Sequence, residues 1–318
     1  MALRVLRVSD GKRGHDNQSI GLLEALARRS QIQVMTLPLV PASRTHVLRV
    51  AGRIALGADT PLLAGMGAGA DTHGRLAELS PQLVVGAGKR CHWPLLAAAR
   101  RYRARGIVLM NPGPYRRLFD LCIVPRHDGV GPAPGILHTD GAINRIRPCP
   151  SARRDDHALV LLGGPASGLR WNDAHIVQQV RRLVASGGCW TVASSRRTPP
   201  TVLAQLADSA AKLVPFDSVD GNWLPRMLPR FATIWVSEDS ASMLYEALSA
   251  GAATGVLEVA GAARRGWVSS GVHELRERGL LVTYGDWSRG RAPHAPAVPL
   301  AEADRCAQWL LSEWLHAA

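Results

Sequence analysis

Short apolar segments recur along this chain, and each is followed by a polar or glycine-rich turn and then by a helical pattern. These segments cover residues 3–8, 81–88 and 106–111 in the first half, and residues 157–165 and 234–236 in the second. Strands that alternate with helices in this way form parallel sheets covered by helices on both faces. The chain is therefore predicted to be an α/β protein built from Rossmann-like units, whose ligands bind beyond the carboxyl ends of the strands.

The alternating pattern is interrupted once, at residues 144–156. This segment is polar, contains prolines and shows no periodicity, as domain linkers do. A chain of 318 residues is long enough for two domains. We therefore predict a first Rossmann-like domain over residues 1–150, a second over residues 151–300, and a C-terminal helix over residues 301–318 that could pack back on the first domain. A further helix is expected over residues 46–56.

The net charge of +13 predicts that the chain attracts polyanions. Nucleotide phosphates, an anionic membrane surface and nucleic acid all fit this charge. The arginines are scattered, and no basic stripe with interleaved aromatic residues is present, so nucleic acid is the least favoured of the three partners.

Neither an apolar signal core at the N-terminus nor a run of about 18 apolar residues occurs. We therefore expect a cytoplasmic protein whose membrane contact, at the inner face of the cytoplasmic membrane, is peripheral. The five cysteines are widely spaced and form no CxxC pair. This spacing favours reduced thiols over a disulfide framework or a zinc site.

Several motifs with a known mechanism are missing from the sequence. No GxGxxG follows a strand, and there is no phosphate-binding P-loop, no HExxH and no GxSxG. The glycine-rich residues 65–69 have the wrong context for a dinucleotide site. A DxD pair, which would hold a metal-bridged diphosphate, is also missing. We therefore expect no metal and no cofactor.

The polar turn after the first strand is the strongest functional signal in the first half. Gly11 and Gly14 would let the backbone bend closely around a ligand. His15 would begin the first helix at the ligand-binding end of the sheet, where a neutral imidazole can take a proton from a hydroxyl group. Asp10 precedes it in the same turn, and Asp16 could orient the imidazole. The alternative is that His15 is an ordinary helix-start or surface histidine.

Two turns of the second half could contact an anion. Gly163 and Gly164 end a predicted strand and would bring the backbone close to a ligand. Ser195 and Arg196 end the next strand, where the guanidinium group could bind a phosphate. Each turn can also be interpreted as a simple connection, with the arginine in solvent.

The segment 234–251 combines a strand, a polar turn and a helix that opens on serine residues. A helix start with Ser240, Ser242 and free backbone N–H groups suits a phosphate. Glu246 follows about one turn into the helix, where it could reach a ribose hydroxyl. The alternative is an ordinary α/β turn in which serine and aspartate cap the helix.

Six motifs of the chain together resemble the mitochondrial-fission Elm-type family, whose bacterial members are regarded as proposed glycosyltransferases. The two most specific are residues 9–18 and residues 237–247. Residues 111–112, 119–120, 162–165 and 194–199 add weaker matches. The resemblance extends from about residue 4 to residue 285.

This resemblance implies a GT-B glycosyltransferase architecture, in which two Rossmann-like domains face each other across a cleft that binds the donor. It assigns His15, with Asp10, to catalysis, Ser240 and Ser242 to the donor diphosphate, and Glu246 to the ribose. It further implies that no metal is bound. The remaining candidates for donor binding are Gly11, Gly14, Gly163, Gly164, Ser195 and Arg196.

The expected function is therefore the transfer of a sugar from a nucleotide-sugar donor to a cell-envelope acceptor, which is expected to be lipid-linked. The alternative is a non-catalytic scaffold of the same fold that binds a nucleotide or a partner.

Overall fold

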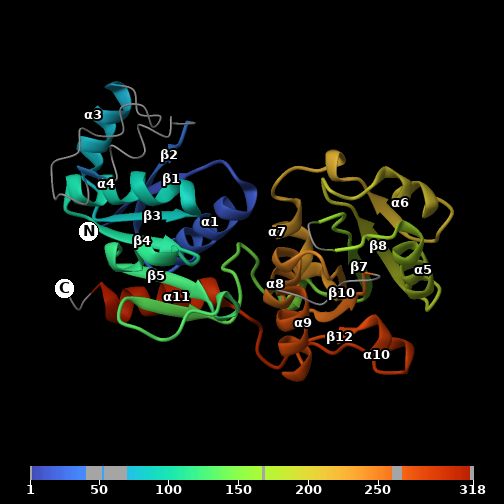
Figure 1. Cartoon of the computed structure of the whole chain (residues 1–318). Coiled ribbons are helices and arrows are strands. Elements are labelled where there is room, and N and C mark those ends of the chain that lie inside the picture. Colours follow the sequence, from blue (N-terminus) through green and yellow to red (C-terminus); the bar gives the residue numbers. More distant parts are fainter. Residues whose placement is uncertain (1, 41–51, 54–69, 167–168, 260–266, 316–318) are drawn as a thin grey trace. The chain divides into compact units, whose positions relative to one another are not determined.

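The computed structural model of the protein describes residues 2–40, 52–53, 70–166, 169–259 and 267–315. The helix expected over residues 46–56 falls almost wholly outside this range, and the glycine-rich residues 65–69 fall entirely outside it. The chain divides into two compact units (Figure 1). Unit 1 consists of Met1–Arg145 with Glu302–Ala318, and unit 2 consists of Ile146–Ala301. The sequence placed the boundary at residues 150 and 151, within the same polar segment.

Within the described residues, unit 1 contains a six-stranded sheet in the order β2-β1-β3-β4-β5-β6. Every pair of neighbours in it is parallel. The strands are β1 (Leu3–Ser9), β2 (Ile32–Pro38), β3 (Leu83–Ala87), β4 (Arg105–Leu109), β5 (Leu121–Pro125) and β6 (Ile136–Thr139). The helices of the unit are α1 (Arg13–Ala27), α3 (Ala70–Leu79), α4 (His92–Tyr102) and α11 (Glu302–Trp309).

Alternation of side chains along the strands builds two cores in unit 1. Val5 and its same-face neighbours pack against α1 and α11, whereas Leu6 and Val8 pack against α3 and α4 on the other face. The middle strands are buried on both faces, which explains their continuous apolar sequences.

The final helix belongs to unit 1 and packs against α1. Arg28 of α1 and Asp304 of α11 form an ion pair at 3.1 Å. Near the C-terminus, the guanidinium group of Arg105 lies 3.3 Å from the ring centre of Trp314 and donates a hydrogen bond to its carbonyl oxygen. The chain therefore begins and ends in the same unit.

The described part of unit 2 contains a second six-stranded parallel sheet, in the order β12-β11-β10-β7-β8-β9. Its strands are β7 (Arg154–Leu161), β8 (Cys189–Ala193), β9 (Lys212–Val214), β10 (Phe231–Ser237), β11 (Ala253–Leu257) and β12 (Val282–Thr283). Its helices are α5 (Asp173–Val184), α6 (Pro200–Gln205), α7 (Trp223–Met227), α8 (Ala241–Ser249), α9 (Trp267–Glu277) and α10 (Tyr284–Ser288).

The core of unit 2 is rich in large aromatic side chains. Trp190 and Trp235 lie on the face of the sheet that α5 and α6 cover, and Trp287 of α10 packs edge-on against Trp235. Helix α8 packs against β10 and β11. Both sheets thus have the layered α/β arrangement that the sequence predicted.

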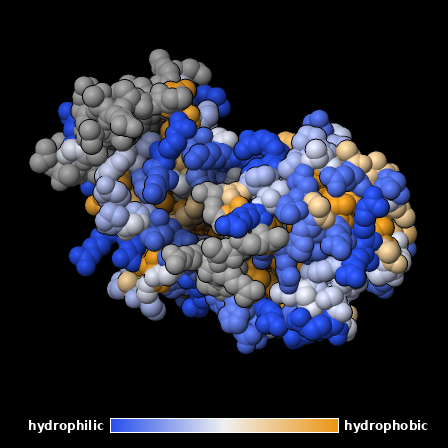
Figure 2. Space-filling view, turned by 45° about the vertical axis from the view of Figure 1, so that its right-hand side comes forward, coloured by the Kyte–Doolittle hydropathy of each residue, from blue (hydrophilic) through white to orange (hydrophobic). Residues whose placement is uncertain are grey.

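Hydrophilic residues cover most of the face seen in Figure 2, with hydrophobic residues showing between them in small groups. Among the residues that the structure describes, no helix is both long and apolar enough to cross a bilayer. The five cysteines form no disulfide bond, and Cys91, Cys122 and Cys306 are buried.

Candidate functional site

The first group of candidate residues lies at the carboxyl edge of the unit 1 sheet. Strands β1 and β3 are parallel neighbours, with Val8 opposite Gly86, so the turns that follow them meet at the same edge. Helix α1 begins at Arg13. The apolar helical pattern starts only at about Ser19, but the helix begins six residues earlier, and His15 lies in its first turn. Polar residues can occupy that turn because much of its surface faces solvent.

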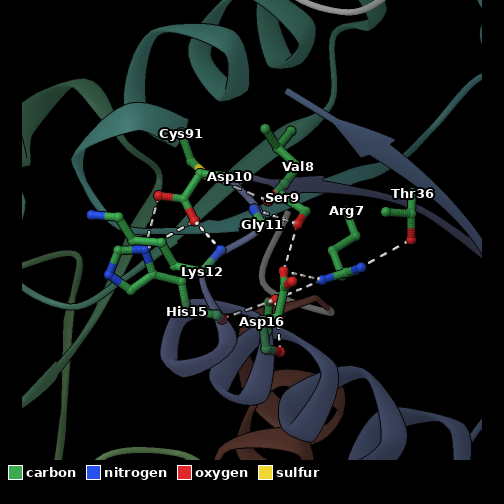
Figure 3. A network of polar contacts seen from close by, with 11 residues as sticks. Arg7, Val8, Ser9, Asp10, Gly11, Lys12, His15, Asp16, Thr36 and Cys91 are labelled. Carbon is green, nitrogen blue, oxygen red and sulfur yellow. Dashed lines mark hydrogen bonds and ion pairs between the residues drawn. The ribbon is translucent and has the colours of Figure 1, made fainter. Parts of the chain in front are cut away.

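Figure 3 shows that the side chains of Asp10 and His15 face each other. Nδ1 of His15 lies 3.1 and 3.0 Å from the two carboxylate oxygens of Asp10. The side chain of Asp10 is fully buried, whereas that of His15 is 20% exposed. A carboxylate only accepts hydrogen bonds, so in the neutral imidazole the proton is held on Nδ1, and Nε2 keeps its lone pair for another proton.

The prediction that Asp16 orients His15 is wrong. Oδ1 of Asp16 accepts hydrogen bonds from Arg7 Nη1 at 2.7 Å and from Ser9 Oγ at 2.5 Å. Adjacent residues on a helix point in different directions, so Asp16 faces β1 while His15 faces Asp10. Asp16 thus ties the start of α1 to the first strand, and Asp10 holds the imidazole.

Gly88 lies against the candidate residue His15, although sequence reasoning did not single it out. A Cβ atom on Gly88 would overlap the imidazole of His15. The residue also has a positive φ of 83°, which side chains rarely adopt. In contrast, a Cβ on Gly11 or Gly14 would meet no atom within 4 Å. Gly11 has a positive φ of 73°, which fits its predicted role in bending the turn, and the contact of both glycines with a ligand stays a prediction.

Cys91 lies close to the Asp10–His15 pair, as Figure 3 shows, and could be taken for a nucleophile. Burial and, to a lesser extent, the charge of Asp10 raise the pKa of its thiol to about 12. The thiolate form that attacks electrophiles is therefore scarce at neutral pH. The Asp10–His15 pair therefore remains the candidate for proton transfer at this edge.

The second group of candidates lies at the carboxyl edge of the unit 2 sheet, where β7, β8 and β10 end side by side. The backbone N–H of Gly163 donates to Ser237 Oγ at 2.7 Å. Ser195 Oγ donates to the carbonyl oxygen of Gly163 at 3.0 Å. The structure thus brings Gly163 and Ser195 together, but Ser195 is engaged with the backbone of the chain.

Asp239 and Arg197 leave no room for a side chain at Gly163 and Gly164. A Cβ on Gly163 would overlap its carboxylate, and a Cβ on Gly164 would overlap the backbone of Arg197. The side chain of Asp239 is fully buried; its Oδ2 accepts from the N–H of Gly164 at 3.0 Å and from Arg197 Nη2 at 2.7 Å. Oδ1 is also buried and has no hydrogen-bond partner among the residues that the structure describes. Asp239 and Arg197 lie inside the motifs that carried the family resemblance, but nothing in their spacing shows that they pair.

Helix α8 starts directly after this network. Ser240 is its N-cap residue, but the serine side chain makes no capping hydrogen bond. The N–H groups of a first helical turn have no partner within the helix, so an anion can accept from them. Ser242 and Arg196 are exposed, whereas Glu246 is 7% exposed. The edge therefore offers backbone donors, exposed polar side chains and the buried carboxylates of Asp239 and Glu246.

Comparison with solved structures shows what this fold resembles. A proposed UDP-N-acetylglucosamine 2-epimerase from Listeria monocytogenes is 12% identical, with a TM-score of 0.54, and the match covers 100% of this chain and 98% of that one. S. aureus MnaA, solved with UDP, is 13% identical, with a TM-score of 0.51 and the same coverage. MurG of Acinetobacter baumannii is 11% identical, with a TM-score of 0.49 over 99% of this chain and 92% of that one.

The predicted fold class, an α/β protein of two Rossmann-like domains of the GT-B type, is confirmed. No curated protein matches the chain by sequence. A family model described as mitochondrial fission ELM1 matches residues 13–314, which include His15, the candidate edge of unit 2 and helix α11. The chain therefore belongs to the mitochondrial fission ELM1 family.

Proposed function

We propose that this protein is a glycosyltransferase that moves a sugar from a nucleotide-sugar donor to a hydroxyl group of a cell-envelope acceptor, without a bound metal. The observation that carries the proposal is the contact between Asp10 and His15. A buried carboxylate that fixes a partly exposed imidazole through Nδ1 is the arrangement that general bases use to activate hydroxyl groups.

In the proposed reaction, Nε2 of His15 takes the proton of the acceptor hydroxyl as its oxygen attacks the anomeric carbon of the donor sugar. The bond from that carbon to the nucleoside diphosphate breaks, and the diphosphate leaves with the electron pair. Asp10 stabilises the imidazolium ion that forms. A single displacement of this kind inverts the configuration at the anomeric carbon, so we expect an inverting enzyme.

The donor would bind to unit 2, at the start of α8. The negative charge on the leaving diphosphate grows during the reaction, and the backbone donors of α8 with Ser240 and Ser242 would stabilise it. Arg196, which is exposed on the neighbouring turn, would add a positive charge. Glu246 would accept from a ribose hydroxyl. Since these groups supply the charge stabilisation, the reaction would need no metal.

Titration with nucleoside diphosphates tests the donor site. The wild-type chain is expected to bind at least one of UDP, ADP, GDP and CDP. Replacing Arg196 or Glu246 by Ala should weaken that binding about 10-fold, since each removes one charge-assisted hydrogen bond. Isothermal titration calorimetry measures the change directly.

Arg181→Ala provides the matched control. Arg181 is on the last turn of α5, which connects parallel strands and therefore ends at the opposite edge of the sheet, and it pairs there with Asp208. The control should bind like the wild type. If no nucleoside diphosphate binds and Glu246→Ala changes nothing, the transferase proposal fails and the non-catalytic scaffold is the better explanation.

A groove in unit 1 supports the proposed contact with an anionic membrane. It has a volume of about 700 Å³, and Arg116 and Arg117 are among its lining residues. Tyr115 and Leu118, from the same short helical segment, are large hydrophobic residues that remain 43% and 41% exposed. Exposed apolar side chains beside paired positive charges are what peripheral proteins present to anionic lipids.

Binding to vesicles tests this contact. Replacing Arg116 and Arg117 together by Ala should weaken binding to vesicles that contain phosphatidylglycerol by about 30-fold, since each basic side chain near such a surface contributes about 1 kcal/mol. A control with Arg181 and Arg226 replaced by Ala has the same net charge and should bind like the wild type. Equal losses in the two double variants, measured by sedimentation, would show that the groove is not the contact.

A further inference from the structure

A cysteine, a histidine and an aspartate meet at the amino-terminal edge of the unit 2 sheet, away from the candidate donor site. Cys189 begins β8, and His157 lies opposite it on the parallel neighbour β7. Paired residues of parallel strands project from the same face of the sheet, so strand pairing alone places the thiol beside the imidazole. Asp156 precedes His157 and completes the group.

The three side chains lie at distances that suit a shared metal ion. One ligand atom from each of them can be chosen so that all three lie within 4.8 Å of one another. His157 Nδ1 is 2.9 Å from Asp156 Oδ1, and Cys189 Sγ is 3.9 Å from Asp156 Oδ2. Tetrahedral zinc with ordinary bond lengths requires separations of about 3.3–3.6 Å between such atoms. Small side-chain rotations would therefore bring the three ligands to one ion.

We propose that Asp156, His157 and Cys189 bind a zinc ion. A thiolate, an imidazole and a carboxylate are the three ligand types that zinc combines in proteins, and the thiolate disfavours magnesium and calcium. Asp156 and Cys189 are exposed, and two of the ligands also line a cavity of about 280 Å³. An ion can thus enter from solvent, and water has room to fill a fourth position.

The ion has no part in the proposed sugar transfer. The donor would bind where the strands of unit 2 end, whereas the zinc ligands lie where β7 and β8 begin. A metal here would join the starts of two neighbouring strands. It would also fix the start of β7, the first strand in the described part of unit 2.

Cobalt(II) tests the proposal, because it takes the place of zinc and absorbs light when a thiolate coordinates it. The full-length, untagged and reduced chain should bind about one equivalent of cobalt, with a thiolate-to-metal band in the near ultraviolet, and zinc should remove that band. Cys189→Ser should abolish the band. Asp156→Asn should weaken cobalt binding by about 10-fold or more. Both side chains are exposed, so neither replacement disturbs the core.

Cys149→Ser is the matched control, because it removes a partly exposed thiol that lies outside the group. This variant should keep the band and the affinity of the wild type. Failure of the wild-type chain to bind cobalt or zinc would overturn the proposal. A band that survives in Cys189→Ser, or that disappears in Cys149→Ser, would also overturn it, because the thiolate would then belong to another site.

Discussion

Replacing His15 by Ala is expected to lower the rate of sugar transfer by a factor of about 10² to 10⁴, the usual contribution of a general base. The affinity for the nucleoside diphosphate should not change, since the donor groups proposed above belong to unit 2. The reason for the loss is geometric: the Asp10 contact leaves Nε2 as the only ring nitrogen able to accept a proton. The effect is measured as the rate at which the enzyme releases free nucleoside diphosphate from a nucleotide sugar.

A comparison of two variants, Asp10→Asn and Asp16→Asn, distinguishes a specific role of Asp10 from a general effect of removing a negative charge. Asp10→Asn should lower kcat, because the amide stabilises the imidazolium ion less well and permits the wrong tautomer. Asp16→Asn removes the same charge from the residue next to His15, but Asp16 contacts Arg7 and Ser9 instead of the imidazole. It should affect stability more than kcat. Near-normal turnover in His15→Ala would remove the base assignment while leaving the fold assignment intact.

The fold was predictable because it depends on periodicity. Apolar segments of strand length, alternating with helical patterns, specify parallel sheets, and the polar residues 144–156 contain the boundary between the units. The start of α1 was not predictable in this way. Residues 13–18 carry no apolar stripe, and they are helical because Asp16 and its partners on β1 fix the first turn.

In the candidate site, too, residues that are close in the sequence could be predicted, whereas contacts that depend on the three-dimensional fold could not. His15 and Asp10 could be chosen from the sequence because they share one turn. Their contact, and the exclusion of Asp16, depend on the direction in which each side chain leaves the helix. The pair of Arg197 and Asp239 joins two turns that are far apart in the sequence. Sequence reasoning therefore chose Arg196, the neighbouring arginine, which the structure leaves exposed.

The stability of unit 2 is expected to depend strongly on one buried carboxylate, that of Asp286. Asp286 is 4% exposed; Arg276 donates two hydrogen bonds to it, at 2.7 and 2.9 Å, and Arg289 donates a third at 2.9 Å. Its Oδ2 also accepts from the N–H of Thr283, while the Thr283 hydroxyl caps α10. Hydrogen bonding from Arg276, followed by that from Thr283 and Arg289, holds the pKa of Asp286 well below its ordinary value.

Asp286→Ala is therefore expected to lower the free energy of unfolding by about 3 kcal/mol at pH 7, near the lower limit for breaking a buried ion pair. The lower limit applies because Arg276 is 33% exposed and regains water when its partner is removed. Asp220→Asn is the matched control, since Asp220 also pairs with an arginine through two contacts but is 59% exposed. Water screens that pair, so the change should be much smaller. Urea unfolding followed by tryptophan fluorescence measures both.

The pH dependence distinguishes the charge of Asp286 from the volume of its side chain. A carboxylate whose pKa is lower in the folded state stabilises the protein fully above its unfolded pKa of about 4. That stabilisation is lost as the pH falls further, at about 1.4 kcal/mol per pH unit, because the unfolded state binds the proton first. The difference between the wild type and Asp286→Ala should thus be constant from pH 5 to 7 and narrow below about pH 4. A difference that stays constant down to pH 3 would mean that lost packing, rather than the ion pairs, accounts for the effect.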